Sequence, residues 1–209
     1  MKARDNPFRV DRVLTLRYRF LTGSWDELLN RIDRQAGRGA IVGPHGSGKT
    51  TLMDELAKRL SRRGTPVHRC RFNLTDHPAT WTNLRTATRD LPDEAMLLLD
   101  GAEQLGPLQW RWLMWWTRHL PGLVITTHRP GRLPTLIDCH TTPDLFCDLV
   151  EQLAPGTFPP EELQTLYEHH AGNLRLCLRE LYDRMAVRDD DTTAKRSPAA
   201  ALPAITRDA

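Results

Sequence analysis

The run AIVGPHGSGKTTL, residues 40–52, constrains this 209-residue chain more than any other segment. It matches the spacing G-x-x-x-x-G-K-[ST] through Gly43, Gly48, Lys49 and Thr50. Glycines let the backbone turn its N–H groups inward around a phosphate chain, and the following helix adds the positive end of its dipole. In such a loop Lys49 reaches the β- and γ-phosphates and the Thr50 hydroxyl binds Mg²⁺. We therefore expect a phosphate-binding loop made by Gly43, Pro44, His45, Gly46, Ser47, Gly48, Lys49, Thr50 and Thr51.

The segments around this loop alternate between strand and helix patterns. Short β-like runs occupy residues 39–43, 66–72, 95–100, 122–127 and 135–142. Several are nearly continuous apolar runs, which is typical of strands covered on both faces. Helical patterns lie between them, and this alternation predicts an α/β fold with a parallel sheet and right-handed crossovers.

Four parts are expected along the chain. Residues 1–23 form a basic, extended amino-terminal arm, and residues 24–142 hold the α/β core, which opens with a helix capped by Ser24. The strand patterns then stop, and residues 143–187 predict two or three short helices in a small lid. The charged and then Ala- and Pro-rich residues 188–209 are typical of a disordered tail.

Acidic residues after the third β-like run supply the rest of the expected magnesium site. Asp100 closes the apolar run AMLLLD, and a carboxylate at the end of a buried strand holds Mg²⁺ in proteins with this loop. Hydrolysis also needs a group that orients the attacking water. Because Gly101 follows Asp100 directly, the nearest candidate is Glu103, whose alternative role is to favour the amino end of the next helix.

Polar residues after later segments complete the candidate site. The fourth run ends in VITTHRP, and Thr127 and Arg129 are favoured as the residues that sense the terminal phosphate, with strand-end capping as the alternative. In GNLRLCLREL, Arg175 lies at the start of a helix. It is either a lid arginine that faces the phosphates or an ordinary surface arginine.

The segment PLQWRWLMWWTRHLPG predicts a helix with four tryptophans and little polar surface. Such a helix is buried on two sides. Either its own domain covers both sides, or one side is an interface with a second copy or a partner protein, where tryptophan is favoured.

Charge, cysteines and hydropathy limit the partners. Residues 1–63 hold 14 Lys and Arg against 7 Asp and Glu. This basic amino-terminal portion either contacts nucleic acid such as DNA or an acidic partner, or is a solvated surface whose arginines serve the nucleotide. The four cysteines lack zinc-like spacing and predict free thiols in a reducing compartment. No run approaches the roughly 18 apolar residues of a membrane span, so we expect a cytoplasmic protein without membrane contact.

Together these motifs resemble those of the additional-strand P-loop NTPases, specifically the AAA+ ATPases and their STAND relatives. GPHGSGKTTL resembles their Walker A loop, LLLDGAEQL their Walker B strand, VITTHRP a sensor 1 strand, and GNLRLCLREL the sensor 2 helix of the origin-recognition and transposition-helper branches. The resemblance implies a three-layer fold with five parallel strands in the order 5-1-4-3-2 and a C-terminal helical lid. It also implies ATP and Mg²⁺ as ligands.

The resemblance assigns roles to individual residues. Lys49 and Thr50 match the phosphate and magnesium ligands, Asp100 the Walker B acid, Thr127 the sensor 1 position and Arg175 the sensor 2 arginine.

Two further positions matter for the activity that the resemblance implies. An arginine acting across a subunit interface is common in this group, and Arg118, at the end of the tryptophan-rich helix, is favoured over Arg132 for that role. The glutamate expected at position 101 is glycine, closer to the NACHT type, so hydrolysis is either slow or dependent on Glu103.

The leading expectation is an AAA+-like ATPase that uses Mg-ATP to drive assembly or remodelling of a protein or DNA complex. A nucleotide-dependent switch or scaffold with little hydrolysis stays open because of Gly101. A small P-loop kinase also stays open, although the GNLR segment and the late Walker B strand argue against it. ATP is favoured over GTP because the sequence has no N-K-x-D guanine-binding motif.

Overall fold

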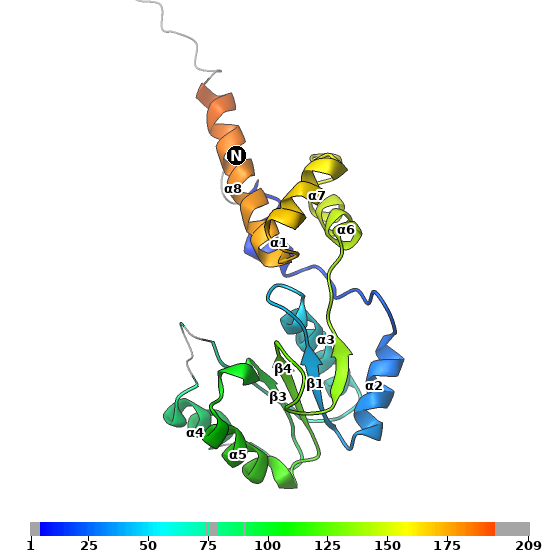
Figure 1. The fold of residues 1–209 in the computed structure, drawn as a ribbon, viewed down its shortest axis with the longest axis vertical. Coiled ribbons are helices and arrows are strands. Elements are labelled where there is room, and N and C mark those ends of the chain that lie inside the picture. The colour runs from blue at the N-terminus through cyan, green and yellow to red at the C-terminus, as the bar shows by residue number, and fades with distance from the viewer. Residues whose placement is uncertain (1–4, 74, 76–78, 90, 195–209) are drawn as a thin grey trace, which may run out of the picture.

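The computed structural model describes residues 5–73, 75, 79–89 and 91–194, with side chains as far as residue 186. Figure 1 shows an α/β core below a small group of helices. In chain order the elements are α1 (Val10–Val13), α2 (Trp25–Arg34), β1 (Arg38–Val42), α3 (Lys49–Arg62), β2 (Val67–Arg71), α4 (Trp81–Arg89), β3 (Met96–Asp100), the 3-10 turn η2 (Ala102–Gln104), α5 (Pro107–Trp116), the 3-10 turn η3 (Thr117–His119), β4 (Leu123–Thr127), β5 (Thr135–Asp138), α6 (Pro143–Leu153), α7 (Pro160–His169) and α8 (Leu174–Ala194).

The five strands form one parallel sheet in the order β2-β3-β4-β1-β5. This confirms the α/β class, the parallel sheet and the order 5-1-4-3-2. Every residue of β3 and β4 is buried, as the continuous apolar runs predict for strands covered on both faces. Because all strands run the same way, their carboxyl ends lie at one edge, which faces the lid helices in Figure 1.

Two helical layers cover the sheet. Helices α2 and α3 pack on one face and helices α4 and α5 on the other, so the core has three layers (Figure 1). Ser24 caps α2, since its Oγ accepts a hydrogen bond from the Glu27 N–H at 3.2 Å. The first apolar layer contains Leu28, Ile32, Ile41, Leu52, Leu56, Leu98 and Val124, and the second contains Val42, Leu84, Leu97, Leu99, Leu113 and Ile125.

The tryptophan-rich helix α5 is covered by its own domain on one side only. Leu113 is fully buried, and Trp110, Trp112 and Trp116 are partly buried against the same layer. Trp115 and Leu108 project outward, with 58% and 72% of their surface exposed. The outer side of α5 is therefore an exposed apolar surface, and its Trp115 side chain is of a type favoured at protein interfaces.

The lid has its own apolar core, to which the amino-terminal arm contributes. Helices α6, α7 and α8 surround Phe146, Leu166 and Leu181, and Phe8 of the arm is buried among them. Asn6 Nδ2 donates to the Tyr182 carbonyl at 2.9 Å. The described part of the arm is thus not a separate extended segment, since it includes the helical turn α1 and packs with the lid.

The end of the lid also differs from the expectation. Helix α8 continues to Ala194, past the boundary expected at 187, because RDDDTTA contains neither proline nor glycine to stop a helix. The remaining residues of the expected tail, 195–209, lie outside the described residues. All four cysteines are free thiols, as predicted. Within the described ranges, no helix is both long and apolar enough to cross a membrane.

Candidate functional site

The glycine-rich loop, residues 43–48, connects the end of β1 to the start of α3 at the carboxyl edge of the sheet. Gly46 and Gly48 have φ angles of 74° and 84°, a left-handed conformation that favours glycine. A Cβ atom on Gly46 would also collide with Asn173 Oδ1 of the lid. Since α3 begins at Lys49, its first-turn N–H groups lack intrahelical partners and are available to an anion in the loop.

Lys49 lies against the backbone of the same loop. Its Nζ donates to the carbonyl oxygens of Gly43 and Pro44, both at 2.7 Å, and the residue is buried. Burial lowers the pKa of Lys49, while the nearby carboxylates of Glu103 and Asp100 oppose this shift. The loop thus concentrates one cation and a set of N–H donors around a small volume, which suits a phosphate group.

Asp100, at the end of β3, is the centre of a hydrogen-bond network. Thr50 Oγ1 donates to its Oδ2 at 2.9 Å, and Thr126 Oγ1 donates to its Oδ1 at 2.6 Å. Arg71 Nε also donates to Oδ2, at 2.9 Å. Burial by itself would raise the pKa of Asp100, but the hydrogen bonds from Thr126 and Thr50 and the charge of Arg71 outweigh it, so the pKa is lowered. Asp100 is therefore a carboxylate at neutral pH, next to a hydroxyl, and this oxygen pair fits Mg²⁺.

The lowered pKa of Asp100 predicts a pH-dependent contribution to stability. Its pKa in the unfolded chain is about 3.9, so the stabilisation is fully present above that pH and is lost as the pH falls through the lower folded value. We expect the gap in unfolding free energy between wild type and Asp100→Asn to narrow as the pH falls from about 6 to about 3. Urea unfolding of both proteins across that range measures it, and a gap that does not change with pH would contradict the prediction.

Glu103 lies beside this network on η2, directly after the turn at Gly101. Its Oε1 is 3.2 Å from His128 Nε2, and its Oε2 is buried and has no hydrogen-bond partner among the described residues. Burial lowers the pKa of His128, as do Lys49 and His45, whereas Glu103 raises it. His128 is therefore neutral at neutral pH, and it holds one oxygen of the Glu103 carboxylate while the other oxygen is buried.

Gly101 explains why no glutamate directly follows Asp100. Its φ angle is 88°, and a Cβ atom there would collide with the carbonyl oxygen of Phe72. The Gly101 N–H donates to Thr126 Oγ1 at 2.8 Å, which ties this turn to β4. The backbone therefore excludes a side chain at position 101, and Glu103 is the acid that this turn presents.

The residues expected to sense the terminal phosphate are only partly in the site. Thr127 Oγ1 donates to the Arg129 carbonyl at 2.8 Å, so this hydroxyl closes the turn after β4. Thr126, not Thr127, bonds to Asp100. Arg175 is exposed at the start of α8, and it is close enough to Lys49 that its charge lowers the pKa of that lysine. The lid thus brings one arginine to the loop.

The two arginines considered for action across a subunit interface, Arg118 and Arg132, lie in different places. Arg118 is in η3, next to the beginning of β1, since Arg38 donates to the carbonyl of Thr117. The Arg118 guanidinium lies 5.3 Å from the Trp115 ring centre, at the end of the sheet opposite the loop. Arg132 instead donates to the carbonyls of Ala102 and Leu105, at 2.7 and 2.6 Å. Arg118 therefore has no route to the site of its own chain.

Sequence reasoning missed Arg71 altogether and ranked Thr126 below its neighbour. A signal for Arg71 existed: β2 and β3 are neighbours in the expected strand order, and the register pairs Arg71 with Asp100. No family model matches this chain, and no curated protein matches it either.

Proposed function

We propose that this chain is a P-loop NTPase of the AAA+ or STAND type that binds and hydrolyses Mg-ATP to drive assembly or remodelling of a protein or DNA complex. The observation that carries the proposal is the pairing of Thr50 with Asp100 at 2.9 Å, beside Lys49. In P-loop ATPases a hydroxyl and a strand-end acid in this relation hold Mg²⁺, and the lysine holds the phosphates. The strand order β2-β3-β4-β1-β5 is the order of that class and supports the proposal.

In this proposal the loop exchanges internal contacts for contacts with the triphosphate. Lys49 Nζ gives up the carbonyls of Gly43 and Pro44 and donates to β- and γ-phosphate oxygens instead. The Thr50 hydroxyl and the Asp100 carboxylate, 2.9 Å apart, are the groups that would hold Mg²⁺. When bound, Mg²⁺ neutralises charge that develops on the phosphates. Arg175 approaches the same phosphates from the lid.

Hydrolysis requires a proton acceptor for the attacking water, and we assign this role to Glu103. The water oxygen bonds to the γ-phosphorus, its proton passes to the Glu103 carboxylate, and the bond to the ADP oxygen breaks. His128 holds the other carboxylate oxygen at 3.2 Å and fixes the direction of the carboxylate. Arg118 enters the proposal only as a residue supplied by a neighbouring subunit.

Assembly is the part of the proposal that the outer side of α5 supports. Trp115 and Leu108 offer an exposed apolar surface with Arg118 next to them, and aromatic and arginine residues are enriched at interfaces. A second copy or a partner protein is the expected occupant. DNA remains in the proposal as a partner of the basic amino-terminal portion, residues 1–63.

A nucleotide switch with little turnover is the second candidate, and Gly101 favours it. The turn excludes the glutamate that many fast ATPases place directly after the strand-end acid. The catalytic acid then comes from a 3-10 turn two residues later. The nucleotide switch differs from the proposed ATPase only in its rate of ATP hydrolysis, so a measurement of turnover distinguishes the two.

Phosphate release from Mg-ATP, measured over a protein concentration series with and without DNA, tests the proposal. We expect turnover that rises with protein concentration and falls at least 100-fold in Lys49→Ala, since removing one preorganised donor costs about that much. Tight ATP binding with no release would reject the ATPase in favour of a switch. ATP consumption that needs an added phosphoryl acceptor and phosphorylates it, with no matching release of inorganic phosphate, would favour a small kinase. Stimulation of phosphate release by DNA would name the partner class.

A further inference from the structure

A second group of ligand-type side chains lies in the lid, away from the glycine-rich loop. His169 and His170 end α7, and Glu180 lies opposite them on α8. One donor atom from each residue lies within 4.8 Å of the others, and His170 Nε2 is 2.6 Å from Glu180 Oε2. Two ligands of one tetrahedral zinc ion are about 3.3 Å apart, so small side-chain rotations suffice to bring all three onto one ion.

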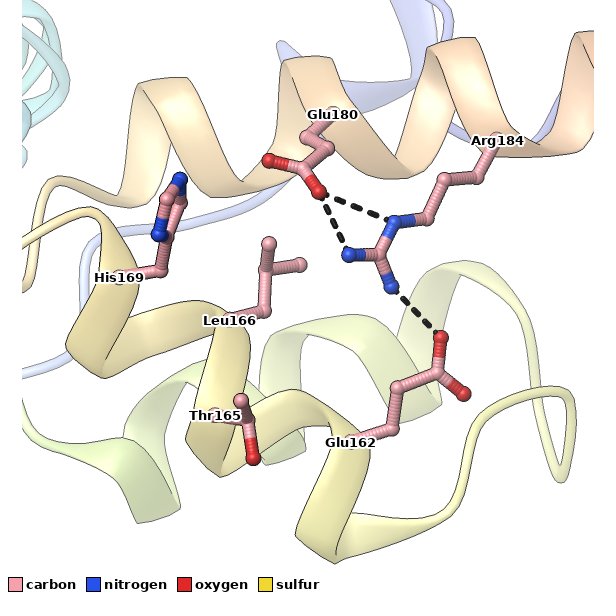
Figure 2. Close-up of a pocket in the computed structure, with 6 residues that line it drawn as sticks. All are labelled: Glu162, Thr165, Leu166, His169, Glu180 and Arg184. Carbon is pink, nitrogen blue, oxygen red and sulfur yellow. Dashed lines mark hydrogen bonds and ion pairs between the residues drawn. The ribbon is translucent and has the colours of Figure 1, made fainter.

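The Glu180 carboxylate is held by a partner that leaves one oxygen for an ion. Arg184 Nε and a terminal guanidinium nitrogen both donate to Oε1, at 3.0 and 2.5 Å, and Arg184 is itself paired with Glu162 at 2.7 Å (Figure 2). Oε2 points instead toward His170. Outer partners of this kind orient a metal-binding carboxylate. Since Glu162, Glu180 and Arg184 together carry one net negative charge, the surroundings attract a cation.

The site is open to solvent on one side. A cavity of about 380 Å³ is lined by Glu162, Thr165, Leu166, His169, Glu180 and Arg184 (Figure 2). His169 is exposed, and 32% of the Glu180 side chain is exposed. A metal ion can therefore enter without unfolding the lid and can complete its coordination with water.

We propose that His169, His170 and Glu180 form a binding site for Zn²⁺ or a similar divalent transition metal, separate from the nucleotide site and independent of the proposed function. Imidazole and carboxylate ligands suit Zn²⁺, Co²⁺ and Ni²⁺ and select against Mg²⁺, which prefers oxygen ligands alone. The ion bridges the end of α7 to α8. The turn that follows His170 leads to Asn173, which abuts Gly46 in the glycine-rich loop, so the ion fixes the part of the lid nearest that loop.

Calorimetric titration of the untagged protein with Zn²⁺, in buffer with excess Mg²⁺, tests this site. We expect one saturable site per chain, with affinity at least tenfold weaker in His169→Ala and in Glu180→Gln. His140→Ala is the matched control, because His140 is also exposed and lies 3.3 Å from an acid, Asp138, outside the cluster. It should bind Zn²⁺ as wild type does.

Co²⁺ provides a second readout that identifies the ligands. We expect visible absorption bands of low-symmetry Co²⁺ without the charge-transfer band of a thiolate ligand, and their loss in His169→Ala. Since His169 is exposed, its replacement should leave the fold intact, which circular dichroism checks. No saturable binding by wild type, equal binding by wild type and both variants, or a thiolate band would each overturn the proposal.

Discussion

Glu103→Gln is expected to lower Mg-ATP turnover at least 100-fold while the affinity for ATP stays within about twofold of wild type. The amide keeps the size and one acceptor oxygen of the carboxylate but cannot take a proton from water. Glu103 contacts His128 at 3.2 Å, and its other carboxylate oxygen is buried without a hydrogen-bond partner among the described residues. Because Glu103 is not one of the proposed phosphate ligands, its replacement removes the proton acceptor and leaves the phosphate ligands in place. Phosphate release and equilibrium binding of a fluorescent ATP analogue measure the two quantities.

Glu94→Gln is the control for this variant. Glu94 is an exposed acid before β3, and its change removes the same charge without touching the loop, so turnover should match wild type. If Glu103→Gln retained full turnover, Glu103 would only favour the amino end of η2, and the proposed proton acceptor would be wrong. If the variant lost ATP binding as well, Glu103 would maintain the structure of the site and would not act as its proton acceptor.

The sequence predicts the backbone of the candidate site well because the determinants are local. A glycine-rich loop between a strand and a helix has few arrangements, and the apolar run that ends in Asp100 identifies a buried strand. The carboxyl ends of neighbouring parallel strands meet at one edge. Asp100 and Thr50 therefore come together although 50 residues separate them.

Side-chain direction is harder to predict from one chain. Adjacent strand residues point to opposite faces of the sheet, so only one of Thr126 and Thr127 can bond to Asp100. The run VITT gives no sign of which of the two threonines points to the same face as Asp100. Arg71 was missed for a similar reason: its strand, VHRCR, reads as partly polar, and its role appears only when β2 is aligned with β3.

Helix ends and distant arginines are the third kind of difficulty. Charged composition after residue 187 indicated a tail, yet α8 continues to Ala194 because acidic residues do not stop a helix as proline does. Arg118 lies in η3, just before β4 begins, so the crossover between two parallel strands places it at the amino edge of the sheet, opposite the loop. The interpretation of Arg118 from spacing left this topology out. Such placements depend on tertiary packing, not on local pattern.

Gly101→Ala is expected to destabilise the protein by about 2–5 kcal/mol. This figure is the sum of the cost of placing alanine in a left-handed backbone conformation and the cost of an overpacked contact. The φ angle of 88° is strained for alanine, and its Cβ would collide with the backbone carbonyl oxygen of Phe72. The Phe72 N–H donates to the Asp100 carbonyl at 2.8 Å, so this backbone is held to the sheet and cannot move freely. For a chain of this length the midpoint of thermal unfolding should fall by roughly 10 °C. Gly101→Glu, which would introduce the acid that many P-loop ATPases carry directly after the strand-end aspartate, should destabilise at least as much and should not raise turnover.

Gly64→Ala separates the two causes. Gly64 also has a left-handed φ, of 81°, but within the described part of the chain no atom beyond its sequence neighbours lies within 4 Å of the position that its Cβ would take. Its replacement should therefore cost only the backbone strain, about 1 kcal/mol. If both alanine variants lost the same stability, the contact with Phe72 would contribute nothing, and glycine at 101 would be needed for its φ angle alone. If Gly101→Glu folded normally and accelerated turnover, the turn would tolerate the acid, and Glu103 would no longer be required as its substitute.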